Sequence, residues 1–520
     1  MQSDRKSRSN LDRSRRFFSF WPLDRFSTLT DDGKQKPREK DLHRNCSGMF
    51  PVRNVLFRKK IGIPLSASLL AVFLAGCGGG GSGSNTPPGE IIYTLSRNGT
   101  ITEYAINPSN GSLYPEGPTI STGTNPIQLL SDPNGAPYAF VLNNGSNTPV
   151  FAGGILTADG SNQGSIQVFS VGSQGLSQSP LFTPTPVGES PVSMAIDSQG
   201  QYLVVADHGY GTGGGGVEIF QIGSNGSLSS VPVSSSPCTN PNKVLFAPPT
   251  DGTVDESLYI VCSSPEIPST QTSSVIYGTI SQFKQSGSTF TAITPNSSAS
   301  IFNLAIDPSD QYVVFPGQSS SGGFVTEFPN KPTSSSSSPS TATLSTSFVP
   351  AGQMAFVGSS SSENVLLGNY DFTAPSTPNT IQPCPVDFTG QTFSCSASPI
   401  PTTQQEGPIA LETNSAGTAL YAVMTQTAVT ANGTPQTSGS ILPYSVSGSA
   451  LASMNPVPTE GWPLSIAFDS NGTHAFVPNY GSGSVSVFSV GANGALSPLN
   501  LNNGSNILSV GANPISVIVR

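Results

Sequence analysis

The sequence of 520 residues has little charge, and that charge is unevenly placed. Only 10% of the residues are Asp, Glu, Lys or Arg, and there are two Trp and three His. Sixteen of the 21 Lys and Arg residues and seven of the 30 Asp and Glu residues precede Cys77, so the net charge is +9 before Cys77 and −18 from there onward. The five remaining basic residues are Arg97, Lys243, Lys284, Lys331 and Arg520. They are too dispersed to form a basic patch for phosphates, which excludes nucleic acid as a partner of this region.

Long apolar runs are also scarce. The run IGIPLSASLLAVFLAG at residues 61–76 is too short to span a bilayer comfortably. Basic residues precede it and small residues end it before Cys77, which is the layout of a secretory signal. The sequence Leu-Ala-Gly-Cys at 74–77 resembles the lipobox of bacterial lipoproteins, in which the Cys is lipidated and becomes the new N-terminus. A buried core helix is the alternative, but the four Gly residues after Cys77 disfavour helix.

This interpretation divides the N-terminal part of the chain into three segments. Residues 1–48 are a basic segment that we place upstream of the true start at Met49, and residues 49–76 are the signal peptide. Residues 77–90 comprise the lipidated Cys77 and a Gly/Ser/Pro-rich tether. In lipoproteins of this kind Asp after the lipidated Cys favours the inner membrane, and here Gly follows. We therefore expect a lipid anchor in the bacterial cell envelope, at the outer membrane or cell surface.

Cysteine is sparse as well. Beyond Cys77 the chain contains Cys238, Cys262, Cys384 and Cys395. An even number of Cys in an exported region predicts two disulfides, and the favoured pair is Cys384 with Cys395, which flank the turn DFTG at 387–390. Four buried thiols are the alternative. No metal site is predicted, because no CxxC motif occurs and only two His residues remain in this region.

Gly and Pro are plentiful, with 55 and 46 residues, and many of them belong to an internal repeat. Each copy has a Pro-led apolar strand, an Asp/Asn/Gly turn, a second apolar strand, a loop, and an alternating strand introduced by Gly. The copy at 463–490 reads PLSIAFDSNGTHAFVPNYGSGSVSVFSV, and the copy at 191–222 reads PVSMAIDSQGQYLVVADHGYGTGGGGVEIFQI. Further copies begin at Pro126, Pro241, Ile301, Pro350 and Pro408.

Each copy has the pattern of one four-stranded sheet, because period-two alternation marks half-buried strands and Asn-Gly pairs supply hairpin turns. Sheets repeated radially make a β-propeller. Residues 91–106 lack an inner strand before them and PISVIVR at 514–520 lacks outer strands after it, so the two ends together complete a blade. We predict an all-β fold in which residues 91–520 form a single eight-bladed propeller closed by its terminal strands. Seven blades are the alternative, because the copy at Pro350 is degenerate.

These repeats resemble the lactonase-type propeller family, which includes bacterial 6-phosphogluconolactonase-like and YVTN-repeat proteins. The resemblance is carried by the Pro-x-x-apolar-Asp-x-x-Gly strands and the Gly-Ser-apolar-x-Val-Phe-x-Val strands, from Ile91 to Arg520. It implies the architecture, whereas activity depends on site residues. Lactone hydrolases of the family have Pro-His-x-His and Gly-Pro-Arg-His motifs on inner strands. The strand starts at Pro191, Pro241 and Pro408 contain neither His nor Arg.

Catalytic candidates are correspondingly few. A phosphosugar lactonase needs cations for its phosphate and a base to activate water, and Arg97 is the one Arg between Cys77 and the C-terminal residue. Asp207 beside His208 is the candidate for an oriented general base. Adjacent strand residues point to opposite faces, however, so a structural or solvent-facing His208 is the favoured interpretation.

Binding candidates gather where the longer loops are expected. In propellers the loops before the inner strand and between the second and third strands share one face, which usually carries the ligand site. Glu189, Glu406 and Glu460 precede the Pro of their inner strands, where they can coordinate calcium or repel anions; solvated turn residues are the alternative. The aromatic residues expected on this face are Tyr210, Tyr370, Trp462 and Tyr480.

These observations favour a binding or scaffold module over an enzyme. The predicted function is a lipid-anchored extracytoplasmic propeller that binds a protein or a glycan at its long-loop face, without a cofactor. The alternative is a lactone hydrolase of the 6-phosphogluconolactonase-like type with a diverged site. His474 is expected to be packed, and the Asp residues that recur at the first hairpins are expected to cap turns. These residues are Asp132, Asp197, Asp307 and Asp469.

Overall fold

The computed structural model divides by contacts into residues 1–81 and 82–520, and it describes residues 90–520 with internal gaps. The gaps are 108–109, 146–149, 153–154, 158–162, 174, 211–212, 234–240, 249–255, 264–277, 287–288, 294–299, 302, 308–311, 320–321, 330–339, 344–349, 360–361, 370–378, 388–391, 396–397, 403–405, 427–437, 449 and 502–503. The predicted start at Met49, signal peptide, lipidated Cys77 and tether up to residue 89 lie outside the described residues. No helix among the described residues is long and apolar enough to cross a membrane.

Regular structure in the described residues consists of strands, which form eight sheets of four or five strands and one two-stranded ribbon. Sheet 1 contains β40 (Pro514–Val519), β1 (Ile91–Ser96), β2 (Thr100–Ile106), β3 (Leu113–Pro115) and β4 (Ile120–Ser121). Sheet 2 contains β5 (Pro126–Ser131), β6 (Tyr138–Asn143), β9 (Gln163–Gly172), β10 (Gly175–Leu176) and β11 (Thr185–Glu189). Sheet 3 contains β12 (Pro191–Ile196), β13 (Tyr202–Tyr210), β14 (Gly213–Ile222) and β15 (Leu228–Val231). Sheet 4 contains β16 (Pro241–Ala247), β17 (Ser257–Ser263), β18 (Gly278–Ser286) and β19 (Thr289–Ile293).

The second half of the chain continues the same pattern. Sheet 5 contains β20 (Ser300–Ile301), β21 (Ala305–Ile306), β22 (Tyr312–Ser319), β23 (Gly322–Pro329) and β24 (Ser340–Thr343). Sheet 6 contains β25 (Pro350–Ser359), β26 (Ser362–Asn369), β27 (Thr380–Asp387), β28 (Thr392–Phe393) and β29 (Ile400–Pro401). Sheet 7 contains β30 (Glu406–Thr413), β31 (Ala419–Gln426), β32 (Ser438–Ser447), β33 (Ala450–Ser453) and β34 (Val457–Glu460). Sheet 8 contains β35 (Ala467–Phe468), β36 (His474–Asn479), β37 (Ser484–Val490), β38 (Leu496–Pro498) and β39 (Ile507–Ser509). The ribbon pairs β7 (Val150–Ala152) with β8 (Ile155–Thr157).

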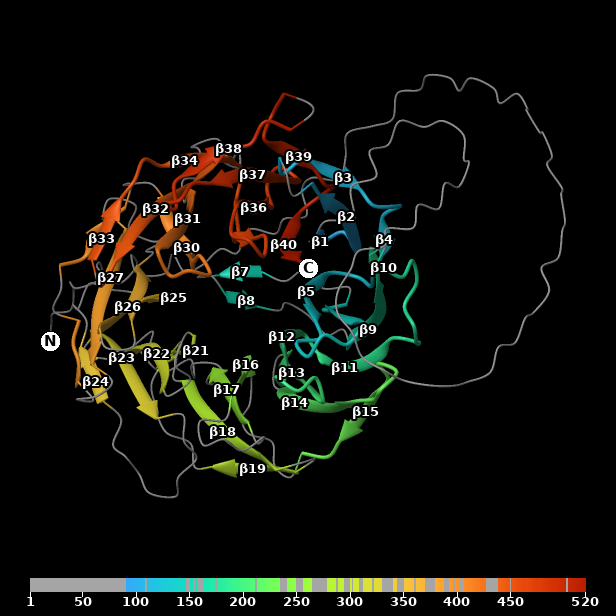
Figure 1. Ribbon diagram of the computed structural model, residues 1–520. Helices are drawn as coiled ribbons and strands as arrows, with labels where there is room; N and C mark the ends of the chain where they lie inside the picture. Colours follow the sequence, from blue (N-terminus) through green and yellow to red (C-terminus); the bar gives the residue numbers. More distant parts are fainter. Residues whose placement is uncertain are drawn as a thin grey trace, which may run out of the picture. The chain divides into compact units, whose positions relative to one another are not determined.

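The sheets follow one another in chain order around a common centre, as Figure 1 shows for the described strands. Innermost strands of successive sheets contact each other, for example β5 with β12 and β12 with β16. The last strand, β40, pairs with β1 and also contacts β5 and β36. The predicted all-β propeller is therefore the observed architecture, and N- and C-terminal strands share one sheet.

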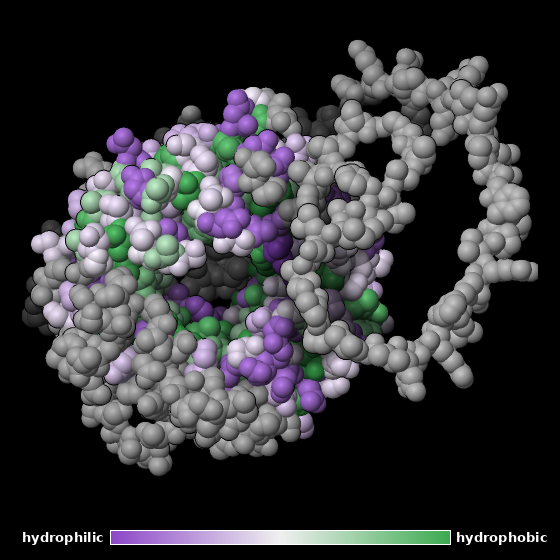
Figure 2. Space-filling model, in the orientation of Figure 1, coloured by the Kyte–Doolittle hydropathy of each residue, from purple (hydrophilic) through white to green (hydrophobic). Residues whose placement is uncertain are grey.

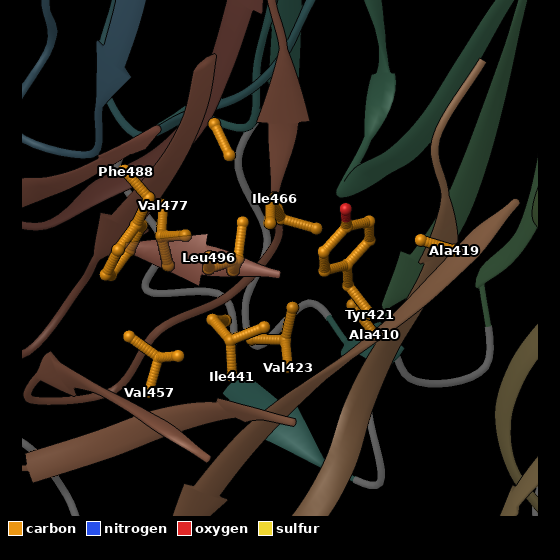
Figure 3. Packing of buried hydrophobic residues seen from close by; sticks show 11 residues of the cluster. Ala410, Ala419, Tyr421, Val423, Ile441, Val457, Ile466, Val477, Phe488 and Leu496 are labelled. Carbon is orange, nitrogen blue, oxygen red and sulfur yellow. The ribbon is translucent and has the colours of Figure 1, made fainter. Parts of the chain in front are cut away.

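The core lies between the sheets. Eight hydrophobic clusters are present among the described residues, and each combines side chains from two neighbouring sheets, including sheets 8 and 1. Figure 3 shows the cluster between sheets 7 and 8, where Tyr421 and Val423 of β31 face Val477 of β36. Second strands such as HAFVPN are buried along their whole length because a sheet covers each of their faces. This explains why they read as continuous apolar runs.

The outer surface mixes polar and apolar residues. Figure 2 shows hydrophilic and hydrophobic residues interspersed over the visible face. Among the described residues the large hydrophobic side chains that are exposed are Tyr114, Leu181 and Phe182. A disulfide joins Cys384 in β27 to Cys395, with a Cα–Cα distance of 4.2 Å, which confirms the pair predicted from the turn between them. Cys262 is also disulfide-bonded, while its expected partner Cys238 lies outside the described residues.

The two ends of the strands define two faces of the propeller. The turn face is formed by the ends where inner strands finish and second strands begin, and in sheets 2, 3, 5 and 8 an Asp side chain caps the turn there, as predicted. Asp197 Oδ1 accepts hydrogen bonds from the backbone N–H groups of Gln201 and Tyr202, at 2.6 and 2.9 Å. Asp469 does the same for Thr473 and His474, at 2.6 and 2.9 Å.

Two further contacts belong to the turn face. His474 is buried, as expected, and its Nδ1 lies 2.8 Å from Asp469 Oδ2. Glu90, the residue before β1, also lies at this face. Its two carboxylate oxygens accept hydrogen bonds from the backbone N–H of Ser470, at 2.9 and 3.1 Å. The opposite edge, where inner strands begin and second strands end, is the mouth face.

Candidate functional site at the mouth face

At the mouth face a recurring backbone geometry connects the start of an inner strand to the end of the second strand. The residue before the inner-strand Pro has a positive φ, and its carbonyl accepts a hydrogen bond from a residue at or just after the end of the second strand. The observed donor and acceptor pairs are Arg97 with Asn513, Asn144 with Asn125, His208 with Ser190, and Tyr480 with Trp462, at 2.8 to 3.0 Å. We call the four donors the rim residues. They occupy equivalent positions in sheets 1, 2, 3 and 8, so their side chains can be compared directly.

Trp462 is the one bulky side chain among the described residues with positive φ before Pro, since the others are Asn125, Ser190 and Asn513. Its φ is 55°, close to the 50° of Asn125 and the 57° of Asn513. Asn tolerates this left-handed conformation, whereas a bulky side chain makes it unfavourable by about 1–2 kcal/mol. A small polar residue is enough to close the turn, as Asn125, Asn513 and Ser190 do in the other sheets. Strain of this kind is typical of functional positions.

Trp462 is the outer part of an aromatic–arginine cluster, which also contains Tyr480, Arg97 and Asn513. The rings of Trp462 and Tyr480 stack with centroids 6.1 Å apart and an interplanar angle of 20°. Arg97 Nη1 donates to the Tyr480 hydroxyl at 2.6 Å, and Asn513 Nδ2 donates to the Tyr480 carbonyl at 3.2 Å. Tyr480 is 8% exposed, while Trp462 and Arg97 are partly exposed. The predicted binding residues Trp462 and Tyr480 therefore lie together.

A second set of equivalent positions lies one residue inside the rim. In sheet 2 Asn143 stands opposite the inner-strand Pro, and its Nδ2 donates to Gln167 Oε1 at 3.3 Å. In sheet 8 Asn479 stands there, and its Nδ2 donates to Ser486 Oγ at 2.9 Å. Both pairs are neutral.

Sheet 3 replaces the neutral pair with two carboxyl groups. Asp207 stands opposite Pro191, and Glu218 takes the third-strand position of Gln167. Burial, the charge of Glu218 and the hydrogen bond between the two carboxyl groups raise the pKa of Asp207 to about 8, although the Gly188 N–H opposes this shift. Burial also raises the pKa of Glu218, against hydrogen bonds from Gly188 and Asp207. A hydrogen bond between two carboxyl groups requires a proton, so this carboxyl pair is partly protonated near neutral pH.

The carboxyl pair is enclosed by its neighbours. Asp207 is 3% exposed, and its Oδ1 has no hydrogen-bond partner within the described residues. A Cβ at Gly188 would lie 2.8 Å from Asp207 Cγ, so only glycine fits there. His208 does not take part: its Nδ1 lies 3.4 Å from the carbonyl of Gly209, and burial lowers its pKa. The partner of Asp207 is thus Glu218, which the sequence analysis missed.

Polar side chains of the inner strands link successive sheets. Gln128 exchanges two hydrogen bonds with the backbone of Met194, at 2.7 and 2.9 Å. Lys243 Nζ donates to the carbonyl of Leu304 at 3.1 Å and to Asn303. Burial lowers the pKa of Lys243 to about 8, with Glu412 opposing that shift. Lys243 is therefore held between sheets 4 and 5.

The remaining candidates are only partly described. Glu189 ends β11 and is exposed, and Glu460 ends β34 and is partly exposed. Glu406 begins β30 and Tyr210 ends β13, but their side chains lie outside the description, and so does Tyr370. Within the described residues no three His, Cys, Asp or Glu side chains are grouped as a metal ion would need. Calcium binding by the three Glu residues stays a prediction.

Comparison with known proteins adds to this geometry. Residues 376–505 match the family described as Lactonase, 7-bladed beta-propeller. The resemblance to lactonase-type propellers is confirmed over these residues. The match includes Trp462 and Tyr480. Arg97 and sheet 3 precede the matched residues, so the carboxyl pair lies outside the match. The lactonase family description specifies seven blades, whereas the described part of this chain forms eight sheets of four or five strands.

Several solved structures are similar over most of the chain. The periplasmic gluconolactonase PpgL of Pseudomonas aeruginosa is 15% identical with a TM-score of 0.47, over 83% of this chain and 98% of that one. A protein from Lactobacillus plantarum is 14% identical with a TM-score of 0.44, over 83% of this chain and 99% of that one. No curated protein matches the sequence.

Proposed function

We propose that this protein is a lipid-anchored extracytoplasmic binding module, located at the outer membrane or cell surface, and that it binds a glycan at its mouth face. The observation that carries the proposal is the strained Trp462, stacked on Tyr480. A partly exposed indole supplies a flat apolar surface, and the apolar face of a pyranose ring packs well on such a surface. Neighbouring hydroxyl and amide groups can then bond to the sugar hydroxyls.

The test is glycan binding by the full chain, measured by array screening and then by calorimetry. Replacement of Trp462 by Asn places the residue of the equivalent positions there, so the turn is kept and only the indole is removed. We expect Trp462→Asn to weaken glycan binding about tenfold or more, since a central aromatic contact contributes about 1.5 kcal/mol or more. Equal binding by the variant would contradict the proposal. Binding to protein partners but to no glycan would favour a protein ligand instead.

A lactone hydrolase with a diverged site is the second candidate. The carboxyl pair favours it, because a carboxyl group with a pKa near 8 can serve as a general acid at neutral pH. The test is hydrolysis of a panel of lactones with a pH-indicator readout. Turnover that is lost in Asp207→Asn and kept in Asn143→Ala, the variant at the equivalent position of sheet 2, would establish this activity. No turnover with any lactone would remove it.

The anchor has a separate test. Mass spectrometry of the processed protein should find an acylated N-terminal Cys77 and no peptides from residues 1–48. A protein that retains residues 1–48 would contradict both the start at Met49 and the lipid anchor.

A further inference from the structure

Arg97 is the cation among the rim residues, and its hydrogen bonds are incomplete. One terminal nitrogen, Nη1, donates to Tyr480, while Nη2 is buried and has no hydrogen-bond partner in the described part of the chain. Leaving a buried donor unsatisfied is unfavourable by about 1–3 kcal/mol, and by more when the donor is charged. Nη2 itself is buried, but Arg97 is partly exposed as a residue, so a ligand that contacts its exposed part can supply an acceptor that the described protein groups do not.

The surrounding charge makes this position unusual. From Cys77 onward the chain has five basic residues and a net charge of −18. Carboxylates are thus abundant, yet among the described residues none is bonded to this guanidinium. Of the other described basic side chains, Lys243 is bonded between two sheets, and Arg520 donates to the carbonyl of Ala136 on the turn face, although its Nη1 has no partner within the described residues. Among the described rim residues, Arg97 is the cation.

Chemical complementarity identifies the kind of acceptor. A guanidinium binds a carboxylate through parallel N–H donors, in a charge-assisted contact about twice as strong as a neutral hydrogen bond. Tyr480 fixes one side of the Arg97 guanidinium, and Trp462 stacks on the Tyr480 ring. The three side chains form one continuous group, with an aromatic surface at one end and a cation at the other.

We propose that the aromatic–arginine cluster binds an acidic glycan, with a pyranose ring on Trp462 and the carboxylate of a uronic acid on Arg97. The inference rests on the proposed glycan binding and adds the charge of the sugar. It also gives Tyr480 a positioning role, because its hydroxyl holds the guanidinium beside the aromatic surface.

The experiment compares two probes that differ only in charge. The full chain is titrated by calorimetry with a tetrasaccharide of galacturonic acid and with the same tetrasaccharide after its carboxyl groups have been reduced. At physiological ionic strength we expect the acidic sugar to bind about tenfold more tightly, as a single charge-assisted contact predicts. Arg97→Gln should abolish this preference, so that the variant binds the two tetrasaccharides with equal affinity. Arg97→Lys should keep only part of it, because an ammonium cannot form the paired contact.

The control is Arg520→Gln, which makes the same change in net charge at the turn face and should keep the full preference. Tyr480→Phe keeps Arg97 and the aromatic ring but removes the hydroxyl that holds the guanidinium. This variant should therefore prefer the acidic sugar less strongly than wild type does. Equal affinities for the two tetrasaccharides, or an undiminished preference in Arg97→Gln, would overturn the inference and leave glycan binding standing. Binding of neither tetrasaccharide would overturn the glycan proposal together with the inference.

Discussion

The turn face and the mouth face are built from the same repeat, yet they have diverged to different degrees. At the turn face sheets 3, 5 and 8 use an Asp whose Oδ1 accepts backbone N–H groups, and sheet 7 uses Asn414 in the same way. At the mouth face the four rim positions hold Arg, Asn, His and Tyr. The turn face is thus constrained by the fold alone, while the mouth face is free to carry ligand-specific chemistry.

The largest change in the free energy of unfolding should come from a substitution at the turn face. Asp469 accepts hydrogen bonds from the backbone and side chain of both Thr473 and His474. Asp469→Ala leaves these buried donors unsatisfied, and we expect a loss of about 3 kcal/mol in the free energy of unfolding, measured with urea. Asp469→Asn should lose much less, because Asn414 performs this role in sheet 7. An equal loss in both variants would contradict a capping role.

The same residue predicts an acid-dependent loss of stability. Burial raises the pKa of Asp469, but hydrogen bonds from His474 and Thr473 outweigh it and lower the pKa to about 2. Its ordinary value is 3.8, so the unfolded chain takes up this proton first as the pH falls. The stabilisation by Asp469 should therefore be complete above pH ~4 and disappear towards pH ~2. Urea unfolding of wild type and Asp469→Asn across this range measures it.

The next largest effect on stability should come from the carboxyl pair of sheet 3, which has neutral counterparts in sheets 2 and 8. The pKa of Asp207 is raised from 3.8 to about 8, so the folded state holds a proton that the unfolded state releases between these values. The free energy of unfolding should therefore fall as the pH rises through this window. Asp207→Asn restores the residue of sheets 2 and 8, and we expect it to stabilise the protein by about 2 kcal/mol near pH 8.

The converse variant sharpens the comparison of these pairs. Asn143→Asp places a carboxyl group at the equivalent position of sheet 2 and should introduce a new loss of stability with rising pH. Urea unfolding at acid and alkaline pH distinguishes these outcomes. Identical pH dependence in wild type, Asp207→Asn and Asn143→Asp would show that the carboxyl pair has no such influence.

The smallest effect on stability should come from the rim. Trp462→Asn relieves about 1–2 kcal/mol of backbone strain and removes a ring contact with Tyr480 of about 1 kcal/mol. These contributions nearly cancel, so thermal unfolding should change little while glycan binding weakens about tenfold or more. A large destabilisation would assign Trp462 to the scaffold and weaken the contrast between the two faces.

Much of the fold follows from the repeat in the sequence. The Pro-led strands, the Asp turns and the pair Cys384–Cys395 depend on short-range patterns, and the structure contains each of them. The carboxyl pair was not predicted, because it depends on the register between β13 and β14, and the Gly run at the start of β14 obscures that register in the sequence. A signal was nevertheless present: alignment of GSIQVFSV, GGVEIFQI and GSVSVFSV places Gln167, Glu218 and Ser486 in one column.

Arg97 was missed for a different reason. In the sequence Arg97 stands out only as a scarce cation, since its partner Tyr480 lies 383 residues away. Pairing of β1 with β40 places the start of the propeller beside sheet 8, and no local pattern contains that information. Comparison of the residues that follow each second strand would have placed Arg97 and Tyr480 at equivalent positions.

The contact between Glu90 and Ser470 has a consequence for orientation. The chain joins the propeller at the turn face, so an anchor upstream would hold the molecule by that side. Twelve residues separate Cys77 from Glu90, and fully extended they reach about 40 Å. If Cys77 carries the proposed lipid anchor, this length limits how far the propeller can stand from the membrane, and the attachment point lies on the face opposite the rim residues.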